Sequence, residues 1–247
     1  MTDRTPADTV EVHADTEALV GAAAVRFVEV VVAAQAARGS ASVVLTGGGT
    51  GIGLLERVRK APGTIDWSEL DIFWGDERFV PAGDPERNEL QARQALLDHV
   101  PVDPARVHPV AASDGEYPDP VEAAAEYSAA VHAHLAEHGA FDLHLLGMGG
   151  EGHINSLFPD TDAVREAHEL VVAVTNSPKP PPVRVTLTLP AIRRARHVVL
   201  VVGGAAKAEA VAAALADADP TDIPAAGARG TESTTWLLDT EAATNLS

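Results

Sequence analysis

The stretch SVVLTGGGTGIG, residues 42–53, decides the expected fold. Its first part, Ser42–Thr46, is a short run of apolar and β-branched residues that is typical of a buried strand. The glycine-rich part, Gly47–Gly53, predicts a tight turn, and the following segment Leu54–Val58 predicts a helix. A strand that passes through a glycine turn into a helix is the repeating unit of an α/β sheet.

The same order of elements recurs along the chain. A buried helix is predicted at Thr16–Ala37, between a cap at Asp15 and a stop at Gly39. About seven strands are predicted, at Ser42–Thr46, Asp71–Trp74, Phe141–Leu146, Leu170–Thr175, Val183–Leu189, His197–Val202 and Thr234–Leu238. Apolar strands that alternate with helices predict an α/β fold with a doubly wound, mostly parallel sheet and helices on both faces. In such a sheet the ligand site lies beyond the carboxyl ends of the strands.

The composition is that of a folded protein with a large core. The chain has 247 residues, of which 46% are hydrophobic and 22% are charged, so we expect one domain over residues 1–247. The formal net charge of −18 disfavours binding to nucleic acid or to anionic membranes. It still permits a small phosphorylated ligand, because remote charges are screened beyond about 10 Å.

Cysteine is absent from the chain, so disulfides, thiolate zinc ligands and a thiol nucleophile are all excluded. The first twenty residues lack the basic and apolar regions of a secretory signal, and no apolar run is long enough to span a bilayer. We therefore expect a cytoplasmic protein with no membrane partner.

The first candidate loop is Gly47–Gly53. Glycines let the backbone approach a ligand, and the start of the following helix presents free N–H groups to an anion. Gly47, Gly48, Gly49 and Thr50 are therefore predicted to bind a phosphate. The loop is not a Walker A motif, because no Lys-Ser or Lys-Thr pair follows, and Ile52 breaks the dinucleotide-binding pattern. A tight turn without a ligand is the alternative.

The second candidate loop is Gly75-Asp76-Glu77-Arg78, directly after the predicted strand Asp71–Trp74. Its charges are expected to face the cleft at the strand ends. The planar guanidinium of Arg78 suits a phosphate, a carboxylate or a developing oxyanion. A solvated charged loop is the alternative.

The third loop, GMGGEGHINSLFP at residues 147–159, carries a histidine on a glycine-rich turn after the strand Phe141–Leu146. With an ordinary pKa of about 6.5, His153 is suited to remove a proton from water as a neutral base. Glu151 is placed to orient or support it. The alternative is a structural or merely exposed histidine.

Two further cations lie at the ends of predicted elements. Arg184 follows the proline-rich segment Ser177–Pro182, and Lys207 is expected within the first turns of a helix, where a phosphate is favoured. Each would be an ordinary surface cation if considered alone. In a strongly acidic chain, their shared position at element ends favours a substrate-binding role.

The segment His134-Leu135-Ala136-Glu137-His138 matches the HxxEH zinc motif. It lies at the end of a predicted helix in which Tyr127, Val131 and Leu135 form a core-facing stripe, and Gly139 supplies a stop. We therefore interpret the match as coincidence and expect no metal site. The chain also lacks the GxSxG motif of serine esterases.

Five motifs occur in one order: GGGTG (47–51), GDERFVP (75–81), GMGGEGHINSLFP (147–159), PPVRVTLTLP (181–190) and GGAAK (203–207). In this order they resemble the 6-phosphogluconolactonase family over nearly the whole chain. The resemblance implies a NagB/RpiA-like, Rossmann-like fold, a cytosolic role in the pentose phosphate pathway, and hydrolysis of 6-phospho-D-glucono-1,5-lactone to 6-phosphogluconate without a cofactor. It also implies His153 as the catalytic base, with Arg78, Arg184, Lys207 and the loop Gly47–Thr50 around the phosphosugar.

The chain departs from the family pattern at two positions. The family usually has Asp where this chain has Glu151, and Ser is common where Gly49 stands. A carboxylate is kept at position 151 with a longer reach, whereas the change at position 49 leaves backbone N–H groups and Thr50 as phosphate donors.

Two other functions remain as alternatives. Glucosamine-6-phosphate deaminases share the fold and a similar histidine loop, but their loop continues toward Asn-Glu-Pro, whereas this chain has SLFP at 156–159. A non-catalytic sugar-phosphate sensor would keep the binding loops and act through a partner, and no DNA-reading segment supports it. We expect a small phosphorylated sugar lactone as the only partner. The sequence does not fix the oligomeric state, and a monomer is favoured.

Overall fold

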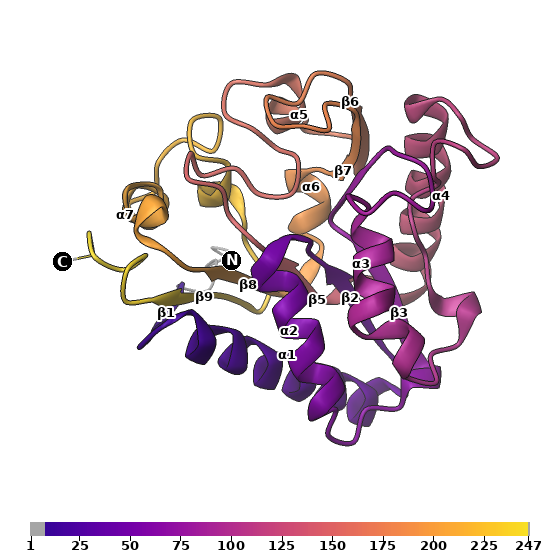
Figure 1. Ribbon diagram of the computed structural model, residues 1–247, viewed down its shortest axis with the longest axis horizontal. Helices are drawn as coiled ribbons and strands as arrows, with labels where there is room; N and C mark the ends of the chain where they lie inside the picture. The colour runs from indigo at the N-terminus through magenta and orange to yellow at the C-terminus, as the bar shows by residue number, and fades with distance from the viewer. Residues whose placement is uncertain (1–7, 247) are drawn as a thin grey trace, which may run out of the picture.

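The computed structural model of the protein describes residues 8–246 and contains two β-sheets with helices around them (Figure 1). The larger sheet has six strands in the spatial order β1-β9-β8-β5-β2-β3, and every neighbouring pair is parallel. Its members are β1 (Thr9–His13), β2 (Ala41–Leu45), β3 (Leu70–Trp74), β5 (Phe141–Leu146), β8 (Ala195–Val202) and β9 (Ser233–Asp239). The predicted parallel α/β sheet is thereby confirmed.

The smaller sheet is antiparallel and corrects part of the strand prediction. Its order is β4-β7-β6, with β4 at Asp76–Arg78, β6 at Val171–Val174 and β7 at Arg184–Leu187. The strands predicted near 170–175 and 183–189 therefore exist, but they lie outside the parallel sheet. The charged segment Asp76–Arg78, expected as a loop, is a strand because its backbone pairs with β7.

Seven α-helices lie in the described part of the chain. They are α1 (Thr16–Arg38), α2 (Gly48–Lys60), α3 (Asn88–Ala95), α4 (Pro120–His138), α5 (Asp162–Arg165), α6 (Leu189–Ile192) and α7 (Ala208–Leu215). The predicted limits of α1 are confirmed, since the Asp15 carboxylate accepts the Ala18 N–H and Gly39 takes a left-handed conformation with φ 86°. Helix α2 begins at Gly48 and not at Leu54, so most of the first candidate loop belongs to the start of a helix. None of the helices between residues 8 and 246 is both long and apolar enough to cross a membrane.

Helices cover both faces of the parallel sheet. Along β8, Val198, Leu200 and Val202 belong to one buried cluster, whereas the intervening Val199 and Val201 belong to a second one. This period of two is expected for a strand that is buried on both sides. Helix α1 lies below the sheet in Figure 1, and α6 and α7 lie above it.

A tyrosine hydroxyl completes the hydrogen bonding at the outer edge of the parallel sheet. Tyr127 of α4 is 1% exposed, and its hydroxyl accepts a hydrogen bond from the Trp74 N–H and donates one to the Trp74 carbonyl, both at 2.8 Å. Trp74 is the last residue of β3, which is the outermost strand. The hydroxyl therefore fixes the point at which the chain leaves the sheet for the second candidate loop.

Replacing Tyr127 by Phe should lower the free energy of unfolding by about 1–3 kcal/mol, because two buried backbone groups lose their partner. Urea denaturation with an unchanged m-value would measure the loss. Tyr117→Phe is the matched control, since Tyr117 is the other tyrosine and packs at the rim of the same core cluster; it should cost no more than about 0.5 kcal/mol. Equal stability of Tyr127→Phe and the wild type would contradict the role of the hydroxyl.

Candidate active site

A cavity of about 300 Å³ lies where the loops after β2, β3, β5 and β8 meet. This is the carboxyl edge of the parallel sheet, as expected for an α/β fold. The cavity is lined by nine of the predicted site residues: Gly47, Gly48, Gly49, Thr50, Asp76, Arg78, His153, Arg184 and Lys207. The tenth, Glu151, lies behind His153 and contacts it.

A tight glycine turn presents His153 to the cavity. The Gly149 N–H donates to the His153 carbonyl at 2.9 Å, and the Gly152 N–H donates to the Gly149 carbonyl at 3.0 Å. A Cβ atom on Gly149 would lie only 2.0 Å from His153 Nδ1, so only glycine fits at this position. On the other side, the imidazole stacks on Phe158 with 4.4 Å between the ring centroids. The ring is therefore held between backbone and an aromatic side chain.

Glu151 links the histidine to a lysine that the sequence analysis did not single out. Its Oε1 lies 3.2 Å from His153 Nδ1 and 2.8 Å from Lys179 Nζ. The contact to Nδ1 has ion-pair distance but not the geometry of a hydrogen bond. Partial burial raises the pKa of Glu151, but the combined effect of the Lys179 ammonium, a backbone N–H and His153 is larger and lowers it to about 2. Glu151 is thus a carboxylate at neutral pH.

The protonation of His153 is set by opposing neighbours. Burial lowers the pKa of His153 below its ordinary value; the Glu151 carboxylate opposes this shift, and the Lys179 ammonium adds to it. The imidazole is therefore neutral at pH 7. A neutral imidazole at the wall of a cavity can accept a proton.

Arg184 and Asp76 form the buried floor of the site. The Arg184 guanidinium donates to the carbonyls of Lys179, Pro180 and Pro181 at 2.9–3.1 Å, which fixes the proline-rich segment. Asp76 Oδ2 lies 3.7 Å from Arg184 Nη1 and accepts a hydrogen bond of 2.6 Å from Ser156 Oγ. These contacts connect the second candidate loop, the third candidate loop and the proline-rich segment Ser177–Pro182.

The amino end of α2 is open toward the cavity. Gly47 stands at the N-cap position, and no side chain accepts the free N–H groups of the first turn. A helix amino end with free N–H groups is a binding site for anions. Gly47 also lies against Asn88, because a Cβ there would come within 2.1 Å of Asn88 Oδ1.

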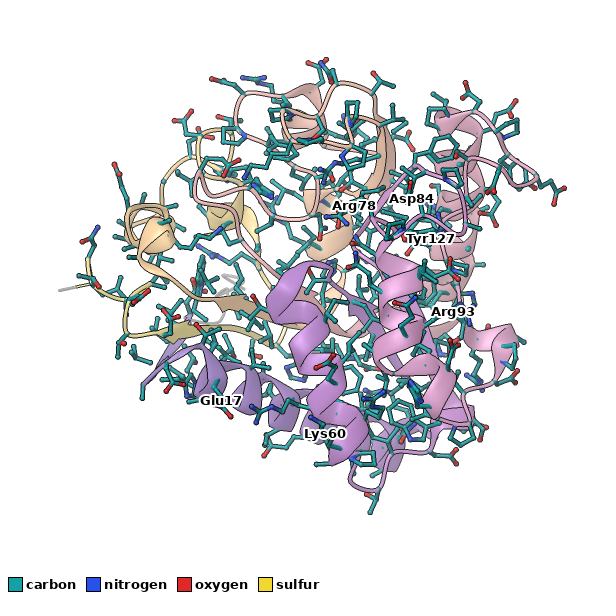
Figure 2. The ribbon with its side chains drawn as sticks, viewed as in Figure 1. Glu17, Lys60, Arg78, Asp84, Arg93 and Tyr127 are labelled. Carbon is teal, nitrogen blue, oxygen red and sulfur yellow. The ribbon has the colours of Figure 1, made fainter. Side chains whose placement is uncertain are left out.

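Two cations complete the wall. Lys207 Nζ donates to the Met148 carbonyl at 2.7 Å. It is the last residue of the short 3₁₀ helix Ala205–Lys207, which runs directly into α7, so it lies at the start of a helical segment, as expected. Arg78 is the last residue of β4 and donates to the Glu86 carbonyl; its Nε is buried and has no partner within residues 8–246. Figure 2 shows Arg78 near the amino end of α3, where α2 also begins.

Three residues of the site are not predicted from the sequence. Lys179 lies in the proline-rich segment Ser177–Pro182, but only the fold brings its ammonium group next to Glu151. Asn155 lines the cavity and takes a left-handed conformation with φ 49°, which its place in the histidine loop did not reveal. Asn88 has no sequence signal at all, because it reaches the cavity only through the contact between α3 and β4, where its amide donates to the Asp76 carbonyl at 2.9 Å.

Fold and site together define the class of the protein. The family model described as glucosamine-6-phosphate isomerases/6-phosphogluconolactonase matches residues 14–236, and the chain belongs to this family. It is 55% identical over 241 residues to the 6-phosphogluconolactonase of Mycobacterium leprae, covering 96% of this chain and 98% of that protein. It is also 55% identical over 243 residues to the 6-phosphogluconolactonase of Streptomyces coelicolor, covering 95% and 93%.

Solved structures agree with these relatives. A 6-phosphogluconolactonase from Trypanosoma cruzi superposes with a TM-score of 0.84 at 30% identity and covers 100% of both chains. A monomeric glucosamine-6-phosphate deaminase has a TM-score of 0.78 at 22% identity, covering 96% of this chain and 99% of that one, and shows a shared fold alone. The resemblance to the 6-phosphogluconolactonases is therefore confirmed.

The opposing influences on His153 predict opposite shifts in two variants. Glu151→Gln should lower the pKa of His153, because a carboxylate that favours the protonated ring is lost. Lys179→Ala should raise it, because the repulsion of an ammonium is lost. The pH dependence of the His153 Cε1–H resonance in NMR spectra would measure both. Lys60→Ala, at the far end of α2 in Figure 2, is the control and should leave the titration unchanged. Shifts of the same sign in both variants would contradict this account.

Proposed function

We propose that the chain hydrolyses 6-phospho-D-glucono-1,5-lactone to 6-phospho-D-gluconate, a step of the oxidative branch of the pentose phosphate pathway. The observation that carries the proposal is the position of His153 at the wall of a cavity that also contains Arg78, Arg184, Lys207 and the amino end of α2. The relatives named 6-phosphogluconolactonase at 55% identity support it. An ester carbonyl, a water molecule and a phosphate are the three groups that such a site can accommodate together.

The phosphate is proposed to bind among the cations and the amino end of α2. Lys207, Arg184 and the N–H groups of Gly48, Gly49 and Thr50 border one cavity. Charge-assisted hydrogen bonds of this kind are about twice as strong as neutral ones. Asp76 repels a phosphate, so its part in binding is proposed to be indirect. It holds Arg184 and Ser156 in place, and its remaining lone pairs can accept a hydrogen bond from a sugar hydroxyl.

His153 is proposed as the general base. Glu151 next to Nδ1 favours the tautomer that carries its proton there, which leaves the Nε2 lone pair free to take a proton from water. The hydroxide formed adds to the lactone carbonyl. The tetrahedral intermediate collapses, the ring oxygen leaves, and the imidazolium returns the proton to it. The proton that His153 takes from water is thus returned to the leaving oxygen, and the proposed steps involve neither a metal nor an organic cofactor.

The developing oxyanion needs a hydrogen-bond donor. Arg78 is the candidate, because it lines the cavity and its guanidinium is only partly engaged by the Glu86 carbonyl. Backbone N–H groups of the glycine loops are the other donors at hand. A preorganised donor of this kind typically contributes a factor of about 10²–10³ to the rate.

The oligomeric state and the cellular compartment are also proposals. One chain brings a histidine, three cations and a helix amino end to one cavity, and we propose that the protein acts as a monomer. The absence of cysteine from the sequence is compatible with a reducing compartment, and we propose the cytosol.

Replacing His153 by Ala should reduce kcat by a factor of about 10²–10⁴, because the general base is lost. The assay follows the disappearance of freshly prepared 6-phosphogluconolactone after subtraction of spontaneous hydrolysis. His168→Ala is the control, since His168 is exposed and lies outside the cavity. Full activity of a folded His153→Ala would eliminate His153 as the base. No acceleration by the folded wild type would reject the lactonase proposal and call for a deaminase assay.

Replacing Lys207 by Met keeps the length of the side chain and removes its charge. For the phosphorylated lactone, KM should rise by roughly tenfold to hundredfold, which corresponds to about 1.5–3 kcal/mol for a lost charged hydrogen bond. Unphosphorylated glucono-1,5-lactone serves as the control substrate and should show no change in KM. An equal loss for both lactones would mean that Lys207 acts only by holding the Met148 carbonyl.

A further inference from the structure

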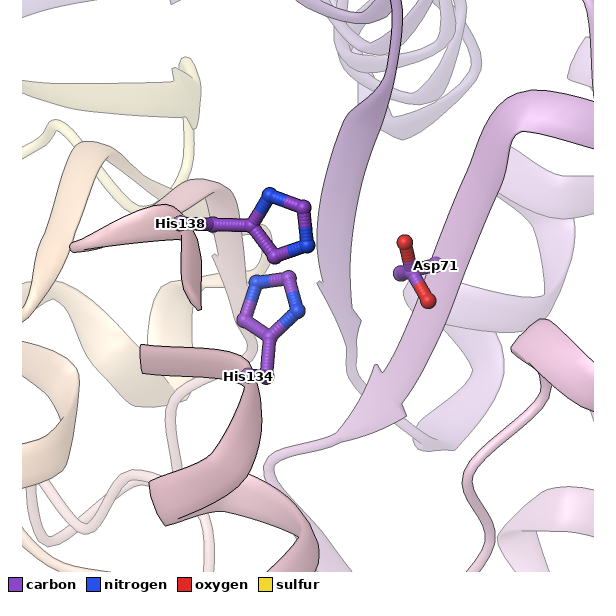
Figure 3. A group of neighbouring side chains, drawn as sticks. All are labelled: Asp71, His134 and His138. Carbon is purple, nitrogen blue, oxygen red and sulfur yellow. The ribbon is translucent and has the colours of Figure 1, made fainter. Parts of the chain in front are cut away.

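Two histidines and an aspartate meet at the opposite end of β3 from the active site. His134 and His138 lie one turn apart at the end of α4, and Asp71 is the second residue of β3. One ligand atom from each of the three residues lies within 4.8 Å of the other two. Figure 3 shows both imidazole rings on the side of α4 that faces the Asp71 carboxylate.

We propose that Asp71, His134 and His138 form a binding site for one divalent transition metal ion of the zinc type, separate from the active site. The expectation from the sequence is that HxxEH is a coincidence. The core stripe Tyr127, Val131 and Leu135 is indeed buried, and Gly139 caps the end of α4, as predicted. The fold adds the third ligand, Asp71, which the sequence motif does not contain.

His134 is the anchor of the proposed site. It is 8% exposed, and its Nε2 is buried without a hydrogen-bond partner among the described residues. Its ring stacks on Phe141 with an interplanar angle of 11° and is tilted against Phe73, so its orientation is fixed. A buried polar atom without a partner is costly, and a metal ion is a ligand that would satisfy it.

Asp71 is oriented by its own hydrogen bonds. Arg106 Nη1 donates to Oδ2 at 2.7 Å, and His108 Nε2 lies 3.0 Å from Oδ1. Each carboxylate oxygen has two lone pairs, so one per oxygen remains for an ion. Partners that hold a ligand carboxylate in this way are common behind the ligands of metal sites.

The surroundings leave room for an ion and its remaining ligands. A cavity of about 240 Å³ is bordered by the three residues and by Glu137 and Asp142. His138 has a side chain that is 33% exposed and provides access from solvent. Two imidazoles and one carboxylate are a donor set for zinc, and water or Glu137 can fill a fourth position. Magnesium and calcium, which prefer oxygen ligands only, fit this set poorly.

The location argues for a structural effect of the ion. Asp71 is the second residue of the outermost strand, whereas Asp76 of the active site follows that strand's end. The five residue steps from Asp71 to Asp76 span roughly 16 Å in an extended chain. A bound ion would join the carboxyl end of α4 to the amino end of β3. Because only the folded chain brings the three ligands together, binding should raise the thermal unfolding midpoint.

The test titrates zinc chloride into full-length protein that carries no affinity tag and has been freed of metal with EDTA. Calorimetry should give one site per chain, and saturating zinc should raise the unfolding midpoint. His138→Ala should weaken zinc binding at least about tenfold and abolish the rise. This side chain is partly exposed and lies outside the catalytic machinery, so lactone hydrolysis should be unchanged. Asp71→Asn provides a second variant, with circular dichroism to check folding.

His132→Ala is the matched control, because His132 is an exposed histidine of the same helix and is not part of the cluster. It should bind zinc as the wild type does. The proposal is overturned if the wild type does not bind zinc, or if His132→Ala loses as much affinity as His138→Ala. It is also overturned if binding persists in His138→Ala and disappears in His153→Ala, because zinc would then occupy the active site.

Discussion

All six strands of the larger sheet run in the same direction, and the position of every functional loop depends on this constraint. Parallel strands deliver their carboxyl ends to one edge, so the loops after β2, β3, β5 and β8 meet although they lie far apart in the sequence. The sheet is buried on both faces, so its strands consist mainly of apolar residues and most polar groups lie in the loops at the strand ends. The edge at the carboxyl ends collects the glycine turns, the histidine and most of the cations of the site.

The small antiparallel sheet brings a buried arginine and an aspartate into the site, which the parallel sheet alone does not supply. Its strand β4 continues directly from β3 through Gly75 and pairs with β7, so Asp76 and Arg184 lie on adjacent strands of one small sheet. Burying an arginine is costly unless its donors are satisfied. Here three backbone carbonyls and Ser156 accept them, and those carbonyls belong to the segment that carries Lys179. A buried charge thus positions a loop, and the loop sets the electrostatic environment of His153 through Glu151.

Much of this arrangement is already encoded in local sequence. The apolar runs, the caps of α1 and the order of the glycine loops predict the parallel sheet and place nine of the site residues at one cavity. What local sequence does not contain is pairing between distant segments. Strand β1 was not predicted, because TVEVH is half exposed and acquires its strand structure by pairing with β9 near the other end of the chain. The sequence predicts a loop at Asp76–Arg78 for the same reason, because three consecutive charged residues give no sign that their backbone pairs with β7.

The histidines show why residue type and spacing alone cannot decide function. His153 and His134 are both largely buried, and burial lowers the pKa of each. His153 has a carboxylate beside Nδ1 and a cavity in front of it, whereas His134 lies against Phe141 with an unpaired nitrogen near a second carboxylate. In the sequence, one lies in a glycine loop, which favours a catalytic role, and the other lies at the end of a helix with a core-facing stripe, which favours a structural role. The role of His134 depends on Asp71, which the chain brings to α4 only through β3, and no spacing within the helix carries that information.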